Sequence, residues 1–300
     1  MDLMFSMKKT LLLTVPAICL IMAACGGNNA PKAVPQNDAF PDIQVPAMIT
    51  EPQARMEYAA EHFWDAFADT SRTGLCDSAH VSGVPSETVE QAFGTYASLL
   101  GSVSPSAASK AVSGLVAQIS ACEAADTSSN VFETLSALAG KYFYDPNSPV
   151  RDEELYLPFA EGMAASPYVD EAGREKYLRA AAVCRMNRPG TVAEDFAYTD
   201  ESGRRRHLYG SVSEYTLVIF ADFGCKACRE TKEALAADET YNSLTASGRL
   251  AVLIVDPAEI PESVYSLRAI PSLYLLDGEK KIILKDTTIE KLISELQKIG

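Results

Sequence analysis

The chain has 300 residues, about twice the length of a typical domain, so we expect two domains. Hydrophobic residues make up 47% and charged residues 22% of the sequence, which excludes a disordered chain, a collagen-like fibre and a polytopic membrane protein. The net charge of −14 at pH 7 disfavours binding of nucleic acid, or of an anionic membrane surface, through a broad charged face.

The first 24 residues have the pattern of a signal peptide. Lys8 and Lys9 precede an apolar run over 11–22 that is too short to span a bilayer comfortably. Two alanines and then Cys25 resemble a bacterial lipobox, in which the cysteine becomes the lipid-modified first residue of the mature protein. This resemblance implies a lipid anchor in the cell envelope, facing the periplasm. Because a glycine and no acidic pair follows Cys25, it favours the outer over the inner membrane. The alternative is an ordinary signal peptide that happens to contain a cysteine.

Residues 25–50 form a separate segment, rich in Pro, Asn, Gly and Ala, with neither helical nor alternating periodicity. We expect a flexible tether of about 25 residues. It would separate the lipid anchor from the first folded domain.

Residues 51–188 predict an all-helical domain, because the apolar side chains recur at spacings of three and four. The first of six expected helices spans 51–69, with Phe63, Trp64 and Phe67 on its apolar stripe. The residues expected to open the other five are Ser86, Ser104-Pro105, Thr127 or Ser128, Ser148-Pro149 and Asp170. We expect no strand and no metal site here, and the region has no recognisable catalytic motif.

Residues 189–300 change to a pattern of short strands and helices. The expected elements are a strand over 215–221, a helix from the Cys225-Lys226-Ala227-Cys228 motif to about 245, a strand over 250–255, a hairpin of 272–276 with 281–285, and a final helix over 287–299. Between 255 and Pro271 the chain is too short for more than a turn or two of helix.

This order of elements, with CxxC at a helix start and Ile270-Pro271 before a hairpin, resembles the thioredoxin fold. A lone CxxC could also be half of a zinc site, but no second cysteine pair lies within reach in the sequence. Pro271 stands where the thioredoxin family places its cis-proline, opposite the dithiol. The expected fold class is therefore α + α/β, with an all-helical domain followed by a thioredoxin-like domain.

Over nearly the whole mature length the chain resembles thioredoxin-like lipoproteins of Bacteroidota, related to TlpA and ResA, which carry an all-helical N-terminal domain of unassigned function. The segments that carry this resemblance are AEHFWDAF (60–67), KYFYDPNSPVRDEELYLP (141–158), EDFAYTDESGRRRHLYG (194–210), FADFGCKAC (220–228) and AIPSLYLLDGEKKIILKD (269–286). The resemblance implies thiol-disulfide oxidoreductase activity with no cofactor and no metal. It also implies a β-hairpin over 195–210.

The CxxC motif suits dithiol exchange. Cys225 is the expected nucleophile, because a helix N-terminus favours the thiolate, and the more shielded Cys228 is the expected resolving thiol. We expect the positive charges of Lys226 and Arg229 to favour the Cys225 thiolate further. Pro271, after Ile270, lacks a backbone N–H, which leaves room for a substrate strand beside the dithiol.

Three positions near the motif depart from thioredoxin. Ile219 replaces the buried aspartate six residues before the first cysteine, and Gly224 replaces the usual Trp or Pro. Asp222 is either an exposed substitute base or a turn residue. A peroxidase is disfavoured, because Val218 and Asp222 stand where a peroxiredoxin has Pro and Thr.

Three cysteines of the helical domain, Cys76, Cys122 and Cys184, have no assigned role. Two of them could form a structural disulfide in an oxidising compartment, or one could exchange with Cys225 as a relay. The third alternative is that all three are buried, inert thiols.

The sequence thus predicts a membrane-anchored periplasmic thiol-disulfide oxidoreductase, more often a reductase than an oxidant in this type of protein. Its expected partners are disulfide-bonded envelope proteins as substrates and a membrane electron donor. The alternative is a binding or scaffold lipoprotein, in which the helical domain recognises a partner and the thioredoxin-like domain is secondary.

Overall fold

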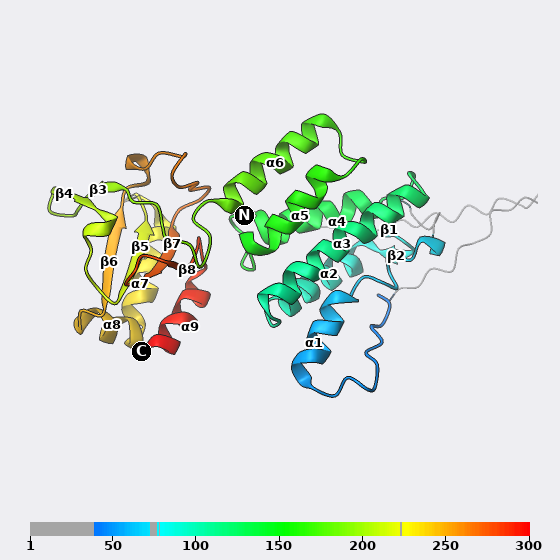
Figure 1. The fold of residues 1–300 in the computed structure, drawn as a ribbon, viewed down its shortest axis with the longest axis horizontal. Coiled ribbons are helices and arrows are strands. Elements are labelled where there is room, and N and C mark those ends of the chain that lie inside the picture. The colour runs from blue at the N-terminus through cyan, green and yellow to red at the C-terminus, as the bar shows by residue number, and fades with distance from the viewer. Residues whose placement is uncertain (1–38, 73–76, 78, 223) are drawn as a thin grey trace, which may run out of the picture. The chain divides into compact units, whose positions relative to one another are not determined.

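The structure, a computed structural model, describes residues 39–72, 77, 79–222 and 224–300 (Figure 1). All of these lie within one compact unit, residues 35–300. The predicted signal peptide, the lipobox residue Cys25, most of the predicted tether and Cys76 lie outside the described residues. Among the described helices, none has the length and apolar character needed to cross a bilayer.

The N-terminal half is helical, as predicted. Its helices are α1 (Pro52–Glu61), α2 (Ser86–Leu100), α3 (Pro105–Ala125), α4 (Val131–Ala139), α5 (Glu153–Ala165) and α6 (Glu171–Arg185). α5 packs against both α3 and α6. The core is strongly aromatic, since Trp64, Phe67, Phe93 and Tyr96 are all almost completely buried and in ring contact with one another or with Phe63. Aromatic contacts of this kind add to the stability that burial alone provides.

Two of the predicted helix starts are confirmed. The Ser104 hydroxyl accepts the backbone N–H of Ala107, and Pro105 occupies the first helical position. The Asp170 carboxylate accepts the N–H of Gly173 at 2.7 Å. Both side chains satisfy N–H groups that a helix start would otherwise leave unpaired.

Of the other three, α2 begins at Ser86 as predicted, but Ser86 is not its N-cap, and the predicted starts of α4 and α5 are too early. Ser86 is already the first residue of α2, and its hydroxyl donates to the Ala79 carbonyl at 3.0 Å. α4 begins after Asn130, not at Thr127 or Ser128. Ser148 donates to the Tyr142 carbonyl at 2.6 Å, and α5 begins after Asp152, whose carboxylate accepts the N–H of Glu154.

Short irregular elements interrupt the helices. The first helix ends at Glu61 instead of 69, and a π-helical turn η2 (Gly140–Tyr144) follows α4. Two-residue strands β1 (His80–Val81) and β2 (Val84–Pro85) form a hairpin that the sequence analysis did not predict. Two residues per strand are too few to show an alternating pattern, although Ser82-Gly83, both with positive φ, suit the tight turn.

The predicted tether is too long at its C-terminal end. Residues 39–50 form no helix or strand, but the Phe40 ring lies 5.4 to 5.5 Å from the rings of Phe63, Trp64 and Phe67. Ile43 also packs against this core. The folded part therefore includes Phe40 and the residues that follow it.

The C-terminal half is built on a mixed sheet in the order β6-β5-β7-β8. Its strands are β5 (Tyr215–Phe220), β6 (Leu250–Val255), β7 (Ser272–Asp277) and β8 (Ile282–Leu284). β5 runs parallel to β6 and antiparallel to β7, and β8 is antiparallel to β7. The β-hairpin expected over 195–210 is present as β3 (Ala197–Thr199) and β4 (Arg205–His207).

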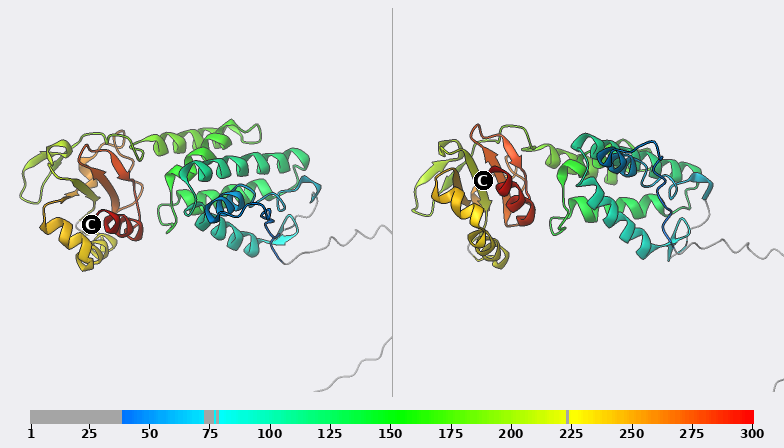
Figure 2. Two further views of the ribbon diagram at one scale, coloured as in Figure 1. Left: turned by 60° about the horizontal axis from the view of Figure 1, so that its bottom comes forward. Right: turned by 90° about the horizontal axis from the view of Figure 1, so that it is seen from below.

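Alternating side chains of β5 pack on opposite sides of the sheet, as the two-residue period of a strand requires. Leu217 and Ile219 join the core formed with α7 (Lys226–Ala237), α8 (Glu239–Ala246) and α9 (Ile289–Ile299), which lie together beside the sheet (Figure 2). Val218 and Phe220 join the core formed with the β3–β4 segment and Tyr265. Between β6 and β7 a single short turn, Pro257–Glu259, stands where thioredoxin has its second core helix.

Candidate active site

Cys225 lies at the carboxyl end of β5, where the chain turns into α7. It is the N-cap of this helix, and its Sγ accepts the backbone N–H of Cys228 at 3.2 Å. Its side chain is partly exposed. A hydrogen bond from a helix N-terminus stabilises negative charge on sulfur, which suits a nucleophilic thiolate.

Cys228, one turn later, is in a different environment. It is 2% exposed and packs in the apolar core with Ile219 and Leu273. Burial raises the pKa of the Cys228 thiol to about 11, and the neighbouring Cys225 adds to the shift. The motif therefore pairs one accessible thiol with one shielded thiol of low acidity.

The loop that ends in Pro271 completes the site. The Ile270–Pro271 peptide bond is cis, and the Ile270 carbonyl oxygen lies 4.0 Å from Cys225 Sγ. In the described part of the chain, the backbone groups of Ala269 and Ile270 form no hydrogen bond with other backbone groups. The fold thus brings the predicted residues Cys225, Cys228, Ile270 and Pro271 together, although 45 residues separate Cys225 from Ile270.

The residues predicted to support the Cys225 thiolate are less closely involved in the site than Cys228, Ile270 and Pro271. The Lys226 ammonium is exposed and forms an ion pair with Glu230 at 3.2 Å, and Arg229 is exposed on the same helix. The Asp222 carboxylate accepts the N–H of Gly224 at 3.0 Å, and its carbonyl accepts the N–H of Cys225. Asp222 therefore shapes the turn before the dithiol, the second of the two roles considered for it.

The other described cysteines lie apart from this site. Cys122 and Cys184 are both buried, and burial raises the pKa of Cys184 to about 12. Both are on helices of the N-terminal half. For Cys184 this environment is that of an inert structural thiol. In the part of the chain that the structure describes, no cluster of His, Cys, Asp or Glu is placed to hold a metal ion.

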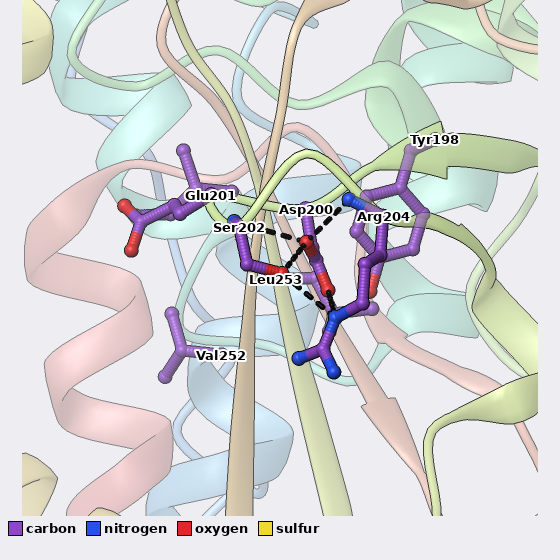
Figure 3. A pocket seen from close by; sticks show the side chains of 8 residues that line it. Tyr198, Asp200, Glu201, Ser202, Arg204, Val252 and Leu253 are labelled. Atoms are coloured by element: carbon purple, nitrogen blue, oxygen red, sulfur yellow. Dashed lines mark hydrogen bonds and ion pairs between the residues drawn. The ribbon is translucent and has the colours of Figure 1, made fainter.

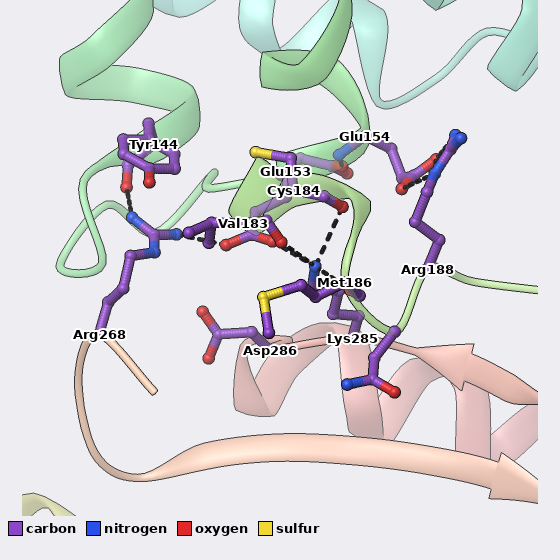
Figure 4. Close-up of polar contacts among 12 residues, drawn as sticks. Tyr144, Glu153, Glu154, Val183, Cys184, Met186, Arg188, Arg268, Lys285 and Asp286 are labelled. Atoms are coloured by element: carbon purple, nitrogen blue, oxygen red, sulfur yellow. Dashed lines mark hydrogen bonds and ion pairs between the residues drawn. The ribbon is translucent and has the colours of Figure 1, made fainter. Parts of the chain in front are cut away.

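A buried polar cluster joins the helical half to the loop before Pro271 (Figure 4). At its centre the Glu153 carboxylate accepts a hydrogen bond from Arg268 at 2.7 Å and forms an ion pair with Lys285 at 2.6 Å. The side chains of Glu153 and Lys285 are only 8% and 7% exposed. Lys285 also donates to the carbonyls of Val183, Cys184 and Met186 at the end of α6, where a helix favours positive charge.

A second contact of the same kind lies just after Pro271. Arg151 donates to the carbonyls of Asp286 and Thr287 at 3.2 Å each, and the Asp286 carboxylate accepts the hydroxyl of Ser272 at 2.7 Å. Burial raises the pKa of Asp286, while Arg151 opposes this shift. The helical half therefore holds the Pro271 loop on both sides. Sequence reasoning missed this, because the partners lie more than 100 residues apart.

Each half of the described molecule carries a hollow. One, of about 250 Å³, lies between the β3–β4 hairpin and β6 (Figure 3). The Asp200 carboxylate there accepts hydrogen bonds from Ser202, Arg204 and Arg206, which hold its pKa well below the usual range. These hydrogen bonds stabilise the turn between β3 and β4. The other hollow, of about 920 Å³, lies on the helical half and includes Arg268 in its wall.

Comparisons with known proteins agree with both halves of the structure. The family model described as Domain of unknown function (DUF5106) matches residues 22–187. The crystal structure of a thioredoxin-like protein from Bacteroides caccae is 31% identical, with a TM-score of 0.73 over 87% of this chain and 99% of that chain. A search of curated proteins finds no match.

Smaller solved structures match over about a third of the chain. The C-terminal domain of an uncharacterized protein from Bacteroides fragilis is 36% identical over 37% of this chain and 98% of its own, with a TM-score of 0.34. The thioredoxin domain of a thiol-disulfide oxidoreductase from Bacteroides vulgatus is 21% identical over 37% and 96%, with a TM-score of 0.32. The chain belongs to the DUF5106 family and is a thioredoxin-like protein.

Proposed function

We propose that the protein is a thiol-disulfide oxidoreductase that reduces disulfide bonds of other proteins. The observation that carries this proposal is the contrast within the CxxC pair. Cys225 is accessible and accepts a helix N–H, whereas Cys228 is 2% exposed and has a raised pKa. This asymmetry suits a reaction in which one thiol attacks first and the other resolves.

The reaction proceeds in two exchanges. The Cys225 thiolate attacks one sulfur of a substrate disulfide, the substrate S–S bond breaks, and the departing sulfur leaves as a thiolate that takes up a proton. Cys228 then loses its proton and attacks Cys225 Sγ, so the mixed disulfide breaks and the second substrate sulfur leaves. Two electrons pass to the substrate, and the Cys225–Cys228 disulfide remains. A dithiol donor must return these electrons in each cycle.

The backbone of Ala269 and Ile270, which forms no hydrogen bond with other backbone groups of the described chain, supports a role in substrate binding. They lie next to Cys225 Sγ, and Pro271 has no N–H that would compete for a partner. An extended substrate segment can hydrogen-bond there as an added strand, with its disulfide facing Cys225.

The cellular setting of the proposal comes from the N-terminal sequence. A lipid anchor on Cys25 would hold the enzyme at the periplasmic side of the envelope, with the outer membrane favoured. Disulfide-bonded envelope proteins would then be its substrates, and a membrane electron donor would regenerate the dithiol. An oxidising compartment supplies disulfides for such an enzyme to reduce.

Reduction of insulin by dithiothreitol tests the proposal. The protein should accelerate it, and Cys225→Ser should reduce the rate to the uncatalysed background. Cys184→Ala is the matched control, because Cys184 is a second, fully buried thiol, carried by α6, and the variant should retain full activity. Equal rates for the wild type and Cys225→Ser would refute the enzyme and favour the scaffold alternative. A loss of activity in Cys184→Ala would instead support the alternative in which a cysteine of the helical domain exchanges with Cys225.

A further inference from the structure

The larger hollow on the helical half has no role in the proposed reaction. We call it the aromatic groove. It has a volume of about 920 Å³, and its principal lining residues are Phe132, Tyr144, Tyr156, Tyr168, Tyr177 and Arg268. This volume is within the range of sites that bind ligands.

The walls of the groove consist largely of aromatic side chains whose rings contact one another. Tyr144 stacks on Tyr156 with 4.4 Å between ring centroids, and Tyr168 meets Phe132 edge to face at 6.3 Å. Tyr168 is 40% exposed although it is a large aromatic residue. Met163 adds a flexible apolar side chain to the same wall. Aromatic rings and methionine together accommodate apolar side chains of varied shape.

The groove carries charges of both signs, two cations and three carboxylates, and several of them already have partners. Its cations are Arg268 and Lys176, and its carboxylates are Glu133, Asp145 and Asp170. Asp145 accepts the N–H of Asn147, and Asp170 accepts that of Gly173. The groove therefore favours an apolar occupant over a strongly charged one.

Arg268 connects the groove to the dithiol. Its guanidinium lies over the Tyr144 ring, 3.9 Å from the centroid, and donates to the Tyr144 carbonyl and to Glu153. Arg268 precedes Ile270 by two residues, which is at most about 7 Å of backbone. The Ile270 carbonyl in turn lies 4.0 Å from Cys225 Sγ. A chain that pairs with 269–270 can thus continue into the groove within a few residues.

We propose that the aromatic groove binds an extended, apolar segment of the disulfide-bonded polypeptide that Cys225 attacks. This inference rests on the proposed function and names its substrate class. A small disulfide reaches Cys225 without entering the groove. A polypeptide occupies both places, since four extended residues span about 13 Å. The helical half then selects unfolded or flexible protein substrates over small disulfides.

Ala137→Trp tests this by filling the groove. Ala137 is an exposed lining residue of α4, and Ala117, exposed on α3 and outside the groove, gives the matched control Ala117→Trp. Truncation of a central contact in an interface costs 1 kcal/mol or more, so Ala137→Trp should raise the KM for insulin by about fivefold or more relative to Ala117→Trp. Its rate with glutathione disulfide should be unchanged. Equal KM values for the two variants, or an equal loss on both substrates, would overturn the proposal.

A binding measurement separates the groove from the redox reaction. Carbamidomethylated insulin B chain has no thiol or disulfide, so its binding does not depend on Cys225. The wild type and Leu178→Ala, which removes an exposed apolar residue outside the groove, should bind it alike, and Tyr168→Ala should bind it about fivefold more weakly. If the proposed function is wrong, the protein will not accelerate disulfide reduction, but Tyr168→Ala will still bind the peptide more weakly than Leu178→Ala. Equal binding by Tyr168→Ala and Leu178→Ala would overturn the groove itself.

Discussion

Replacing Glu153 with alanine should destabilise the protein through the buried cluster that joins its two halves. Glu153 is the carboxylate shared by Lys285 and Arg268, whose side chains are 7% and 17% exposed. Without it, two buried cations lose their counter-ion. The removal of one partner from a buried pair costs 3 to 5 kcal/mol, because a charge remains in a poorly solvated place.

The contacts that remain set the expected magnitude. Lys285 keeps three carbonyls at the end of α6, and Arg268 keeps the Tyr144 carbonyl and ring. We therefore expect the lower end, about 3 kcal/mol. Glu153→Gln keeps an acceptor but loses the charge, and we expect about 1.5 kcal/mol. The control is Glu279→Ala, because Glu279 pairs with Lys281 at the surface and such pairs contribute about 0.5 kcal/mol or less.

Urea unfolding measures these differences. Trp64, the single tryptophan, is buried in the helical core and reports on that half, and circular dichroism reports on the whole chain. With an m-value of about 3 kcal/mol/M, a loss of about 3 kcal/mol lowers the midpoint by about 1 M. An equal midpoint for Glu153→Ala and Glu279→Ala would show that the cluster does not stabilise the protein, and would refute the reasoning.

Three further predictions concern the dithiol and the packing. Because the pKa of Cys228 is about 11, the fraction of Cys228 thiolate available for the resolving step increases with pH. Release of a preformed mixed disulfide, followed by stopped flow, should therefore become about tenfold faster per pH unit between pH 7 and 9. A rate that does not change with pH would contradict the assignment of Cys228 as the resolving thiol. Phe40→Ala should cost about 2 kcal/mol in urea unfolding, because its ring touches three core rings, whereas Met48→Ala, at a residue 88% exposed, should cost almost nothing. Gly162→Ala should lower thermal stability by about 1 to 3 kcal/mol, since its Cβ would lie 2.8 Å from Val116 Cγ1, while Gly114→Ala, with open space, should be neutral or stabilising.

Much of the thioredoxin-like half could be predicted from sequence. The strand over 215–220, the CxxC motif at the start of α7 and the hairpin after Pro271 follow from local patterns that long-range contacts do not override. The approach of Ile270 to Cys225 followed from the resemblance to thioredoxin, not from any local signal. The helical half was harder at its boundaries, because Ser86 and Ser148 could act as caps but bind other carbonyls instead.

The contacts between the halves could not be predicted at all. Arg151 and Glu153 stand in a segment rich in charge, where nothing in the sequence distinguishes a buried ion pair from a solvated one. Their partners, Asp286, Arg268 and Lys285, lie in another domain. Only the tertiary structure shows that these residues hold the loop on both sides of Pro271. The same holds for the aromatic groove, whose wall combines residues of the helical half with Arg268 of the other half.

The helical domain is in direct contact with the thioredoxin-like half and is more than a spacer. It supplies the carboxylate that engages Arg268, and it carries the groove next to the loop that faces the dithiol. A thioredoxin-like half expressed alone would leave Lys285, buried in the whole chain, without its counter-ion. Tests of the proposed function should therefore use the whole folded chain.

The most direct measurement of the central claim is a trap with Cys228→Ser. Without the resolving thiol, the substrate should remain joined to the protein through Cys225, and mass spectrometry after non-reducing separation should find the mixed disulfide at that residue. Cys225→Ser should capture nothing. Absence of any adduct at Cys225 in the Cys228→Ser variant, or an equal adduct through Cys122 or Cys184, would contradict the account.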